Sequence, residues 1–207
     1  FENDSVYFPT TVTAAPSSIM SLSSMLTSLP AYYISRNYDD FKYDNDQFLS
    51  LHKILKNEGY DIHSIFNSNE LRFLFSNILN HVDKKYWPKG TLASQENWSN
   101  ETMNKILDKF LSSNNYNKPF FLIAWYNIRL DPRTSELIQD GINILKKHSV
   151  WDDSIFILSS DHGYFDPRRG FTPESLQEQG LSHDLLMTDD NVNIPFYLRY
   201  PDSPVKK

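Results

Sequence analysis

The stretch Ser154-Ile155-Phe156-Ile157-Leu158-Ser159-Ser160-Asp161-His162-Gly163 joins a short apolar run to an Asp-His pair. The run Ser154 to Ser159 has the length of a buried strand rather than of a helix. Asp161 and His162 therefore fall at a strand end, where open α/β sheets form their sites. A carboxylate oxygen and an imidazole nitrogen at this edge are suitable ligands for a divalent metal. The alternative is a turn in which Asp161 caps the next residues and His162 is simply exposed.

Other apolar segments alternate between helical and strand patterns. Helical spacing is found over residues 51–58, 71–82, 103–111 and 132–145, and strand-like runs are found over 60–66, 120–125 and 194–200. Gly59 stands where a helix should end, Ser99 or Asn100 is expected to cap the third helix, and Asp131-Pro132 is expected to open the fourth. This alternation predicts one α/β domain over residues 1–207, with a mostly parallel sheet sandwiched by helices.

Composition narrows the function classes. The 207 residues are 40% hydrophobic, which is enough to bury a core, and carry a net charge of −6 with a pI near 5.5. A nucleic-acid partner is not expected, because there is no basic surplus or stripe. A membrane segment is not expected either, because no apolar run approaches the roughly 18 residues of a spanning helix. The absence of cysteine excludes disulfides, thiolate nucleophiles and zinc-thiolate sites.

A second histidine with a carboxylate follows the Asp161–His162 pair. Gly180-Leu181-Ser182-His183-Asp184 precedes the strand predicted at 194–200. A loop between neighbouring strands can return His183 to the same sheet edge. Asp161, His162 and His183 would then form a metal or oxyanion site. The alternative for His183 is an ordinary polar loop residue.

The third element of interest lies near the beginning of the chain. The stretch from Thr13 to Leu22 runs from an extended segment into a helix, with Pro16 near the first turn. A helix N-terminus attracts anions through its free N–H groups and its dipole. We expect Ser17 to contribute to binding a sulfate or phosphate group here. The alternative is that Thr13 or Ser17 only caps the helix.

Five motifs in a fixed order give the chain a family resemblance. They are Ala14-Ala15-Pro16-Ser17-Ser18 with Ser24-Met25-Leu26-Thr27-Ser28-Leu29-Pro30, Leu55-Lys56-Asn57-Glu58-Gly59-Tyr60, Lys118-Pro119-Phe120-Phe121-Leu122, the Ser154–Gly163 stretch, and Ile194-Pro195-Phe196 with Tyr200-Pro201. In this order they resemble the sulfatase branch of the alkaline-phosphatase superfamily. The resemblance implies an alkaline-phosphatase/sulfatase-like fold and a metal-dependent hydrolase of sulfate or phosphate esters.

The resemblance also implies roles for individual residues. Asp161 and His162 would be metal ligands, and His183 would contact the metal or the substrate oxyanion. The metal would be calcium, as in the sulfatases proper, or zinc or manganese, as in the phospho-transferring relatives. The substrate would be a sulfated or phosphorylated small molecule or glycan. By the same analogy the protein would act in the periplasm or outside the cell.

Several positions depart from the family pattern. Ala14 occupies the nucleophile position but has no atom that can attack, and Ser18 replaces the usual arginine. The first strand, with its acidic metal-binding pair, would precede Phe1, so we expect a domain incomplete at its N-terminus. The chain could be a trimmed or altered enzyme, or an inactive domain that binds a sulfated or phosphorylated glycan. A further alternative makes neighbouring Thr13 the attacking group, and another makes the protein a phosphoethanolamine or phosphoglycerol transferase.

Overall fold

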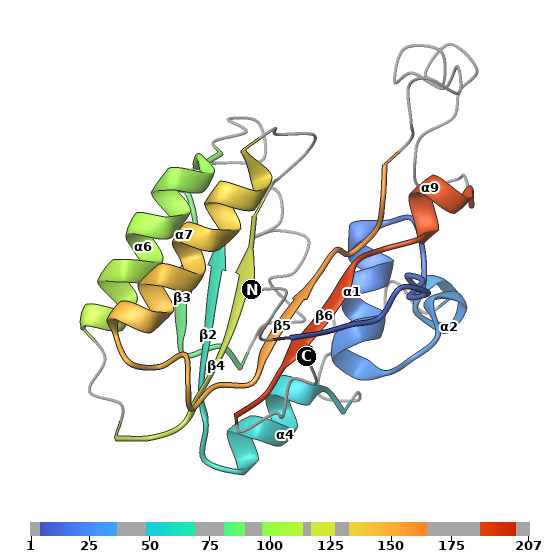
Figure 1. The fold of residues 1–207 in the computed structure, drawn as a ribbon. Coiled ribbons are helices and arrows are strands. Elements are labelled where there is room, and N and C mark those ends of the chain that lie inside the picture. The colour runs from blue at the N-terminus through green and yellow to red at the C-terminus, as the bar shows by residue number, and fades with distance from the viewer. Residues whose placement is uncertain are drawn as a thin grey trace. The chain divides into compact units, whose positions relative to one another are not determined.

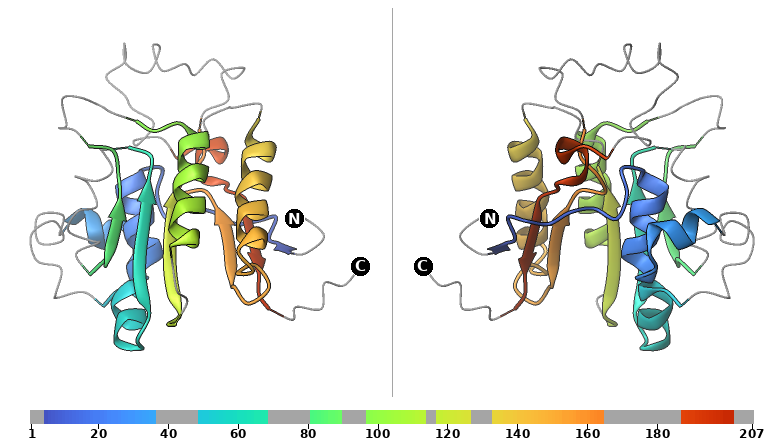
Figure 2. Two further views of the ribbon diagram at one scale, coloured as in Figure 1. Left: turned by 90° about the vertical axis from the view of Figure 1, so that its left-hand side faces the viewer. Right: turned by 90° about the vertical axis from the view of Figure 1, so that its right-hand side faces the viewer.

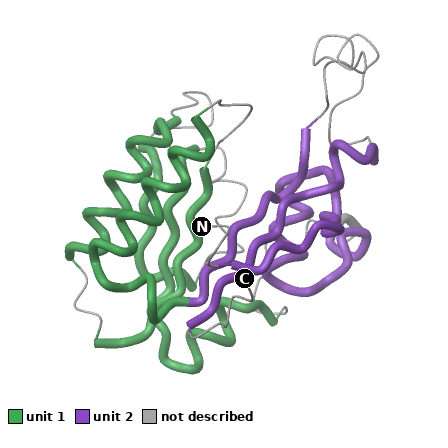
Figure 3. The backbone as a smooth tube through the Cα atoms, in the orientation of Figure 1, with its two compact units in different colours: residues 1, 42–154 green, residues 2–41, 155–207 purple. Residues whose placement is uncertain are grey.

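The computed structural model describes residues 5–36, 49–68, 81–89, 97–113, 117–126, 133–164 and 187–201. The chain forms two compact units, residues 1 and 42–154 in unit 1 and residues 2–41 and 155–207 in unit 2 (Figure 3). Among the described residues, no helix is long and apolar enough to cross a membrane. The single domain expected over residues 1–207 stays a prediction.

Unit 1 is a parallel sheet with helices (Figure 1). Its elements are α4 (Leu51–Asn57), β2 (Asp61–Phe66), β3 (Lys84–Tyr86), α6 (Asn100–Ser112), β4 (Phe120–Trp125) and α7 (Thr134–Lys147). The strand order is β3-β2-β4, and β2 pairs with β4 in parallel from Asp61↔Phe120 to Phe66↔Trp125. The expected strands and parallel pairing are therefore found in this unit.

Helix α6 supplies much of the unit 1 core because its apolar residues recur at helical spacing. Ser99 is the N-cap and accepts a hydrogen bond from the Thr102 N–H at 3.2 Å, as one of the two predicted caps. Met103, Leu107, Phe110 and Leu111 of α6 pack with Ile65 of β2 and with Val150. Figure 2 shows α6 and α7 side by side from two further directions, and the two helices are in contact.

Three details of unit 1 differ from or fall outside the sequence prediction. Helix α7 begins at Thr134 with Arg133 at the N-cap, and the predicted start at Asp131-Pro132 lies outside the described residues. Strand β4 is half-buried rather than buried on both faces, because β2 occupies the central position of the three strands. Most of the helix predicted over 71–82 lies outside the described residues. The predicted end of α4 is confirmed, since Gly59 has φ 86° just after it.

In its described residues, unit 2 contains an antiparallel sheet and three helices. Its elements are β1 (Val6–Tyr7), α1 (Ser18–Thr27), α2 (Ala31–Arg36), β5 (Phe156–Ser159), α9 (Asp189–Val192) and β6 (Phe196–Arg199). The strand order is β1-β6-β5. The predicted sheet is mostly parallel, whereas β5 and β6 pair antiparallel, because β6 starts beside Ser159, where β5 ends, and so runs in the opposite direction.

Candidate functional site

The Ser18 hydroxyl lies against the Asp161–His162 pair within unit 2. Ser18 is the first residue of α1, and its Oγ donates a hydrogen bond to Asp161 Oδ2 at 2.5 Å. The same Oγ is 3.2 Å from His162 Nε2, which is 3.3 Å from Asp161 Oδ2. All three side chains are half-buried. A hydroxyl, a carboxylate and an imidazole therefore converge at one point just past the end of β5.

The contact made by Nδ1 of His162 fixes the tautomer and the orientation of the imidazole ring. His162 Nδ1 is 2.6 Å from the backbone oxygen of Gly163. A carbonyl oxygen only accepts hydrogen bonds, so Nδ1 carries the proton in this contact. In the neutral ring Nε2 is then the atom with a free electron pair, and it faces Ser18 and Asp161. This is the orientation that a histidine needs to bind a metal through Nε2.

Ser18 also stands at the positive end of a helix. Ser17 is the N-cap of α1 and its side chain makes no capping hydrogen bond. The first backbone hydrogen bond of the helix runs from the Ser21 N–H to the Ser17 oxygen at 2.8 Å. The N–H groups before Ser21 have no partner within the helix, and the helix dipole adds a partial positive charge. The environment of the Ser18 hydroxyl therefore favours an anionic group.

Backbone contacts to α9 hold the Asp161–His162 segment. The Gly163 N–H donates to the Asn191 oxygen at 2.8 Å. A Cβ atom on Gly163 would lie 1.9 Å from the backbone oxygen of Asp190, so only glycine fits this approach. The Ser160 hydroxyl donates to the backbone oxygen of His162 at 2.5 Å. The turn that carries the site is thus pinned on both sides.

The residues predicted from the sequence have different positions. Asp161 and His162 are adjacent in space as well as in sequence. Ala14, the predicted nucleophile position, is exposed. Thr13 is buried, and its hydroxyl contacts the backbone oxygens of Ala15 and Asp161. Ser17 is half-buried at the N-cap, and His183 lies outside the described residues.

Sequence reasoning missed Ser18, which is the side chain that actually reaches the pair. The family motif, matched at Pro16, places the nucleophile two residues before this proline, at Ala14. Ser18 then only stands where the motif usually has an arginine. The signal that could have found it is the helix boundary. A serine at the first helical position presents its hydroxyl at the N-terminus, where the following turn does not cover it.

The donor atoms at this point fit a divalent metal. The 3.3 Å between Asp161 Oδ2 and His162 Nε2 is close to the edge of a tetrahedron with metal-ligand bonds of about 2.1 Å. Within the part of the chain that the structure describes, no group of three His, Cys, Asp or Glu residues is placed to hold a metal ion. A metal at this point would therefore need donors in addition to Asp161 and His162.

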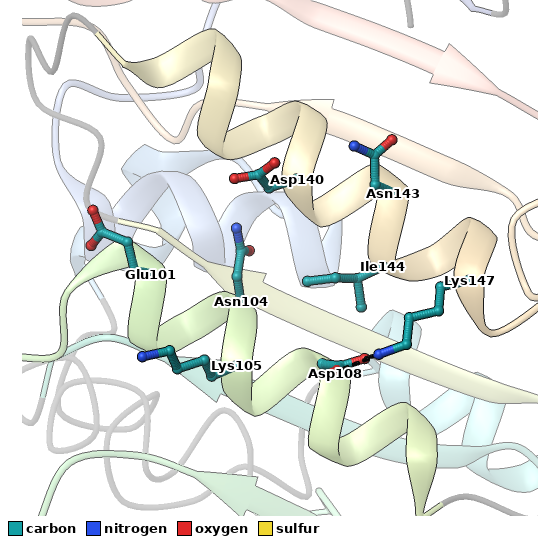
Figure 4. A pocket seen from close by; sticks show the side chains of 8 residues that line it. All are labelled: Glu101, Asn104, Lys105, Asp108, Asp140, Asn143, Ile144 and Lys147. Carbon is teal, nitrogen blue, oxygen red and sulfur yellow. Dashed lines mark hydrogen bonds and ion pairs between the residues drawn. The ribbon is translucent and has the colours of Figure 1, made fainter.

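Unit 1 also has a groove, which lies between α6 and α7 (Figure 4). It has a volume of about 390 Å³ and is lined by charged and amide side chains and by Ile144. Its charges are partly matched within the unit. Lys147 Nζ is 2.8 Å from Asp108 Oδ1, and His148 Nε2 is 2.7 Å from the same oxygen. The hydrogen bonds from Lys147 and His148 hold the pKa of Asp108 below its usual value. The groove offers no convergent set of reactive groups like that around Ser18.

Comparisons with known proteins give one family match and several similar solved structures. Residues 2–127 match the family model described as Sulfatase. No curated protein sequence matches the chain. Among solved structures, the lipoteichoic acid synthase LtaP from Listeria monocytogenes is similar, with a TM-score of 0.70 and 18% identity over 98% of this chain and 58% of its own.

Two further structures are periplasmic domains. That of the phosphoethanolamine transferase EptC from Campylobacter jejuni gives a TM-score of 0.63 at 12% identity, over 95% of this chain and 68% of its own. The C-terminal periplasmic domain of EcEptC from Escherichia coli, a complex with zinc, gives 0.59 at 17% identity, over 97% of this chain and 63% of its own. The chain therefore spans 58% of LtaP and 63% of the EcEptC domain.

Proposed function

This chain belongs to the sulfatase family, and we propose that it cleaves sulfate or phosphate esters with the Ser18 hydroxyl as the nucleophile. The α/β fold predicted as alkaline-phosphatase/sulfatase-like is confirmed by the similar structures. The observation that carries the proposal is the position of Ser18 Oγ, 2.5 Å from Asp161 Oδ2 and 3.2 Å from His162 Nε2 at a helix N-terminus.

Asp161 and His162 would hold a divalent metal beside this hydroxyl. When bound, the metal neutralises charge on the ester oxygens and makes the hydroxyl more acidic. Calcium and manganese prefer oxygen ligands, whereas an imidazole nitrogen suits zinc. The pairing of a carboxylate with His162 Nε2 therefore supports zinc over the calcium expected from the sulfatases proper, and manganese remains the alternative given by the resemblance. One similar structure was solved as a zinc complex.

The residues of the chain account for the displacement itself. Ser18 Oγ attacks the phosphorus or sulfur atom, the bond to the ester oxygen breaks, and the departing alcohol takes up a proton. Without a metal, the Ser18 hydroxyl donates to Asp161 Oδ2; when that oxygen holds the metal, the Ser18 proton leaves to water, and the departing alcohol takes its proton from water. The N-terminus of α1 favours the negative charge of the transferred group. Water, or an acceptor hydroxyl, then releases that group from Ser18.

The substrate class can be phosphate or sulfate, since both esters present anionic oxygens around a tetrahedral centre. The family match supports a sulfate ester, as predicted from the sequence. The names of two similar structures, a lipoteichoic acid synthase and a phosphoethanolamine transferase, support a phosphodiester instead. In that case the acceptor would be a hydroxyl of a phosphorylated or sulfated envelope molecule or glycan, outside the cytoplasm.

A catalytically inactive binding domain is the second candidate. It is motivated by Ala14 at the motif's nucleophile position. Ala14 is exposed between buried Thr13 and Ala15, whereas Ser18 faces Asp161 and His162. The exposed position predicts that Ala14 has no part in the displacement, so its identity does not decide whether the chain is active.

Kinetic comparison of two variants tests the proposal. The full-length protein, with zinc or manganese, would be assayed on p-nitrophenyl sulfate, p-nitrophenyl phosphate and bis(p-nitrophenyl) phosphate. Ser18→Ala should lower kcat by at least about 100-fold, because the attacking oxygen is lost. Ala14→Ser is the matched control and should leave kcat unchanged.

Each result has a distinct meaning. The ester that the unaltered chain turns over fastest identifies the substrate class. Activity that survives Ser18→Ala would overturn the role of Ser18. No turnover by the unaltered chain, with activity gained in Ala14→Ser, would favour the inactive binding domain and the original motif alignment.

A further inference from the structure

The backbone oxygen of Asp161 is held by two buried hydroxyls. Ser21 Oγ donates to this oxygen at 2.5 Å, and Thr13 Oγ1 contacts it as well. The two hydroxyl oxygens are 2.6 Å apart. Ser21 is 1% exposed and Thr13 is 7% exposed, so water has little access to either hydroxyl. We propose that Thr13 and Ser21 act as positioning residues that fix the Asp161 carboxylate against Ser18.

Helix α1 reaches Asp161 at two points. Ser18 and Ser21 are three residues apart and so lie on the same helix face. Ser18 contacts the carboxylate of Asp161, and Ser21 contacts its backbone oxygen. Two contacts from one rigid helix determine both the location and the direction of the carboxylate, which a single contact would leave free to turn.

Thr13 connects this arrangement to the return segment before β6. Its N–H donates to the Val192 oxygen at 2.8 Å, and the Gly163 N–H donates to the Asn191 oxygen at 2.8 Å. The segment containing Thr13 and the turn containing Asp161 are thus attached to adjacent residues of α9. The Thr13 hydroxyl closes this loop of contacts at the Asp161 backbone oxygen.

The number of hydrogen-bond donors predicts how far each of the two hydroxyls contributes to holding the Asp161 backbone oxygen. Together they carry two protons, and the acceptors are the Asp161 oxygen, the Ala15 oxygen and either hydroxyl. If either hydroxyl is removed, the Asp161 oxygen keeps only one of its two hydroxyl donors and is held less firmly. Loss of both leaves this half-buried oxygen without a hydroxyl donor, and the site is free to shift.

The inference rests on the proposed role of Ser18 and is tested in the same ester assay. Thr13→Val and Ser21→Ala should each lower kcat by about 10-fold, as expected for loss of one buried hydrogen bond. The double variant should lose about 100-fold, the effect of a displacement of about 1 Å at a reacting group. KM should stay within about 2-fold throughout, because the substrate contacts are unchanged.

Two controls separate positioning from general stability. Thr13→Ser keeps the hydroxyl and should retain the kcat of the unaltered chain. Ser23→Ala removes a hydroxyl from the same helix that is buried and, among the described residues, has no hydrogen-bond partner. It should leave kcat and the thermal midpoint unchanged. The single variants carry the test if the double variant does not fold.

The carbonyl ¹³C chemical shift of Asp161, measured in labelled protein, gives a readout that does not need activity. It reports hydrogen bonding to this oxygen and should move upfield in Thr13→Val and Ser21→Ala but not in Ser23→Ala. If Ser18→Ala abolishes turnover while both single variants keep full kcat, the positioning role is overturned and the proposed function stands. If Ser18→Ala has no effect, the proposed function fails. An unchanged ¹³C shift in Thr13→Val and Ser21→Ala would overturn the positioning role of these two residues as well.

Discussion

Among the described glycines, Gly163 is the one whose replacement by alanine should disturb the site most. The new Cβ atom would lie 1.9 Å from the backbone oxygen of Asp190, 3.0 Å from its carbonyl carbon and 3.2 Å from the Asn191 Cα. All three atoms belong to the backbone, so no side-chain rotation relieves the contact. Ordinary van der Waals separation requires the two segments to move apart by about 1.5 Å.

The expected cost follows from this movement. Overpacking of this kind costs about 1–3 kcal/mol, and loss of the Gly163–Asn191 hydrogen bond adds about 1 kcal/mol. We therefore expect Gly163→Ala to lower the free energy of unfolding by about 2–4 kcal/mol. Because Asp161 and His162 directly precede this position, kcat should fall by about 100-fold in the fraction that remains folded.

Gly141 provides the matched control. A Cβ atom there would meet its nearest neighbour, Asn104 Oδ1, at 3.6 Å, which is an ordinary contact. Gly141 lies inside α7, where alanine is favoured over glycine by about 1 kcal/mol. Gly141→Ala should therefore be neutral or stabilising. Urea unfolding followed by circular dichroism measures both variants, and a Gly163→Ala chain as stable as the unaltered one would refute the described approach of α9.

Two further predictions concern unit 1. Ser99→Ala should lower the free energy of unfolding by about 1 kcal/mol, because the Thr102 N–H loses its cap, and an unchanged urea midpoint would contradict that role. Burial lowers the pKa of His63, so the folded chain resists the proton that the unfolded chain binds below about pH 6.5. The stability contributed by neutral His63 is present above that pH and lost as pH falls through the lowered pKa of the folded state. His63→Gln should reduce this loss, and parallel stability curves for the two chains between pH 7 and pH 5 would contradict the argument.

Local patterns in the sequence predicted the elements of the fold better than their pairing. Helix α6 and its Ser99 cap could be recognised because cap and apolar spacing both act within a few residues. The antiparallel direction of β6 could not, because it depends on where the return segment, through Asn191, meets Gly163. The start of α7 at Thr134 could not be predicted to the residue, since a good capping sequence does not by itself fix the helix boundary.

The candidate site was predicted in part. Asp161 and His162 were recognisable because they follow an apolar run and so stand at a strand end. Ser18 was not, because its role depends on the first turn of α1 meeting a segment about 140 residues later in the chain. The hydroxyls of Thr13 and Ser21 were also beyond sequence patterns, since buried serines and threonines look like ordinary helix and turn residues until their partners are known.

Mass spectrometry of the covalent state tests the central claim most directly. The full-length protein would be incubated with zinc or manganese and a model sulfate or phosphate ester, quenched in acid, digested and analysed. The peptide containing Ser18 should gain the mass of one phosphoryl or sulfuryl group, and fragmentation should assign that group to Ser18. The modification should be absent in Ser18→Ala and present in Ala14→Ser. Turnover with the group on another residue, or with no covalent state in a rapid-quench series, would contradict the account.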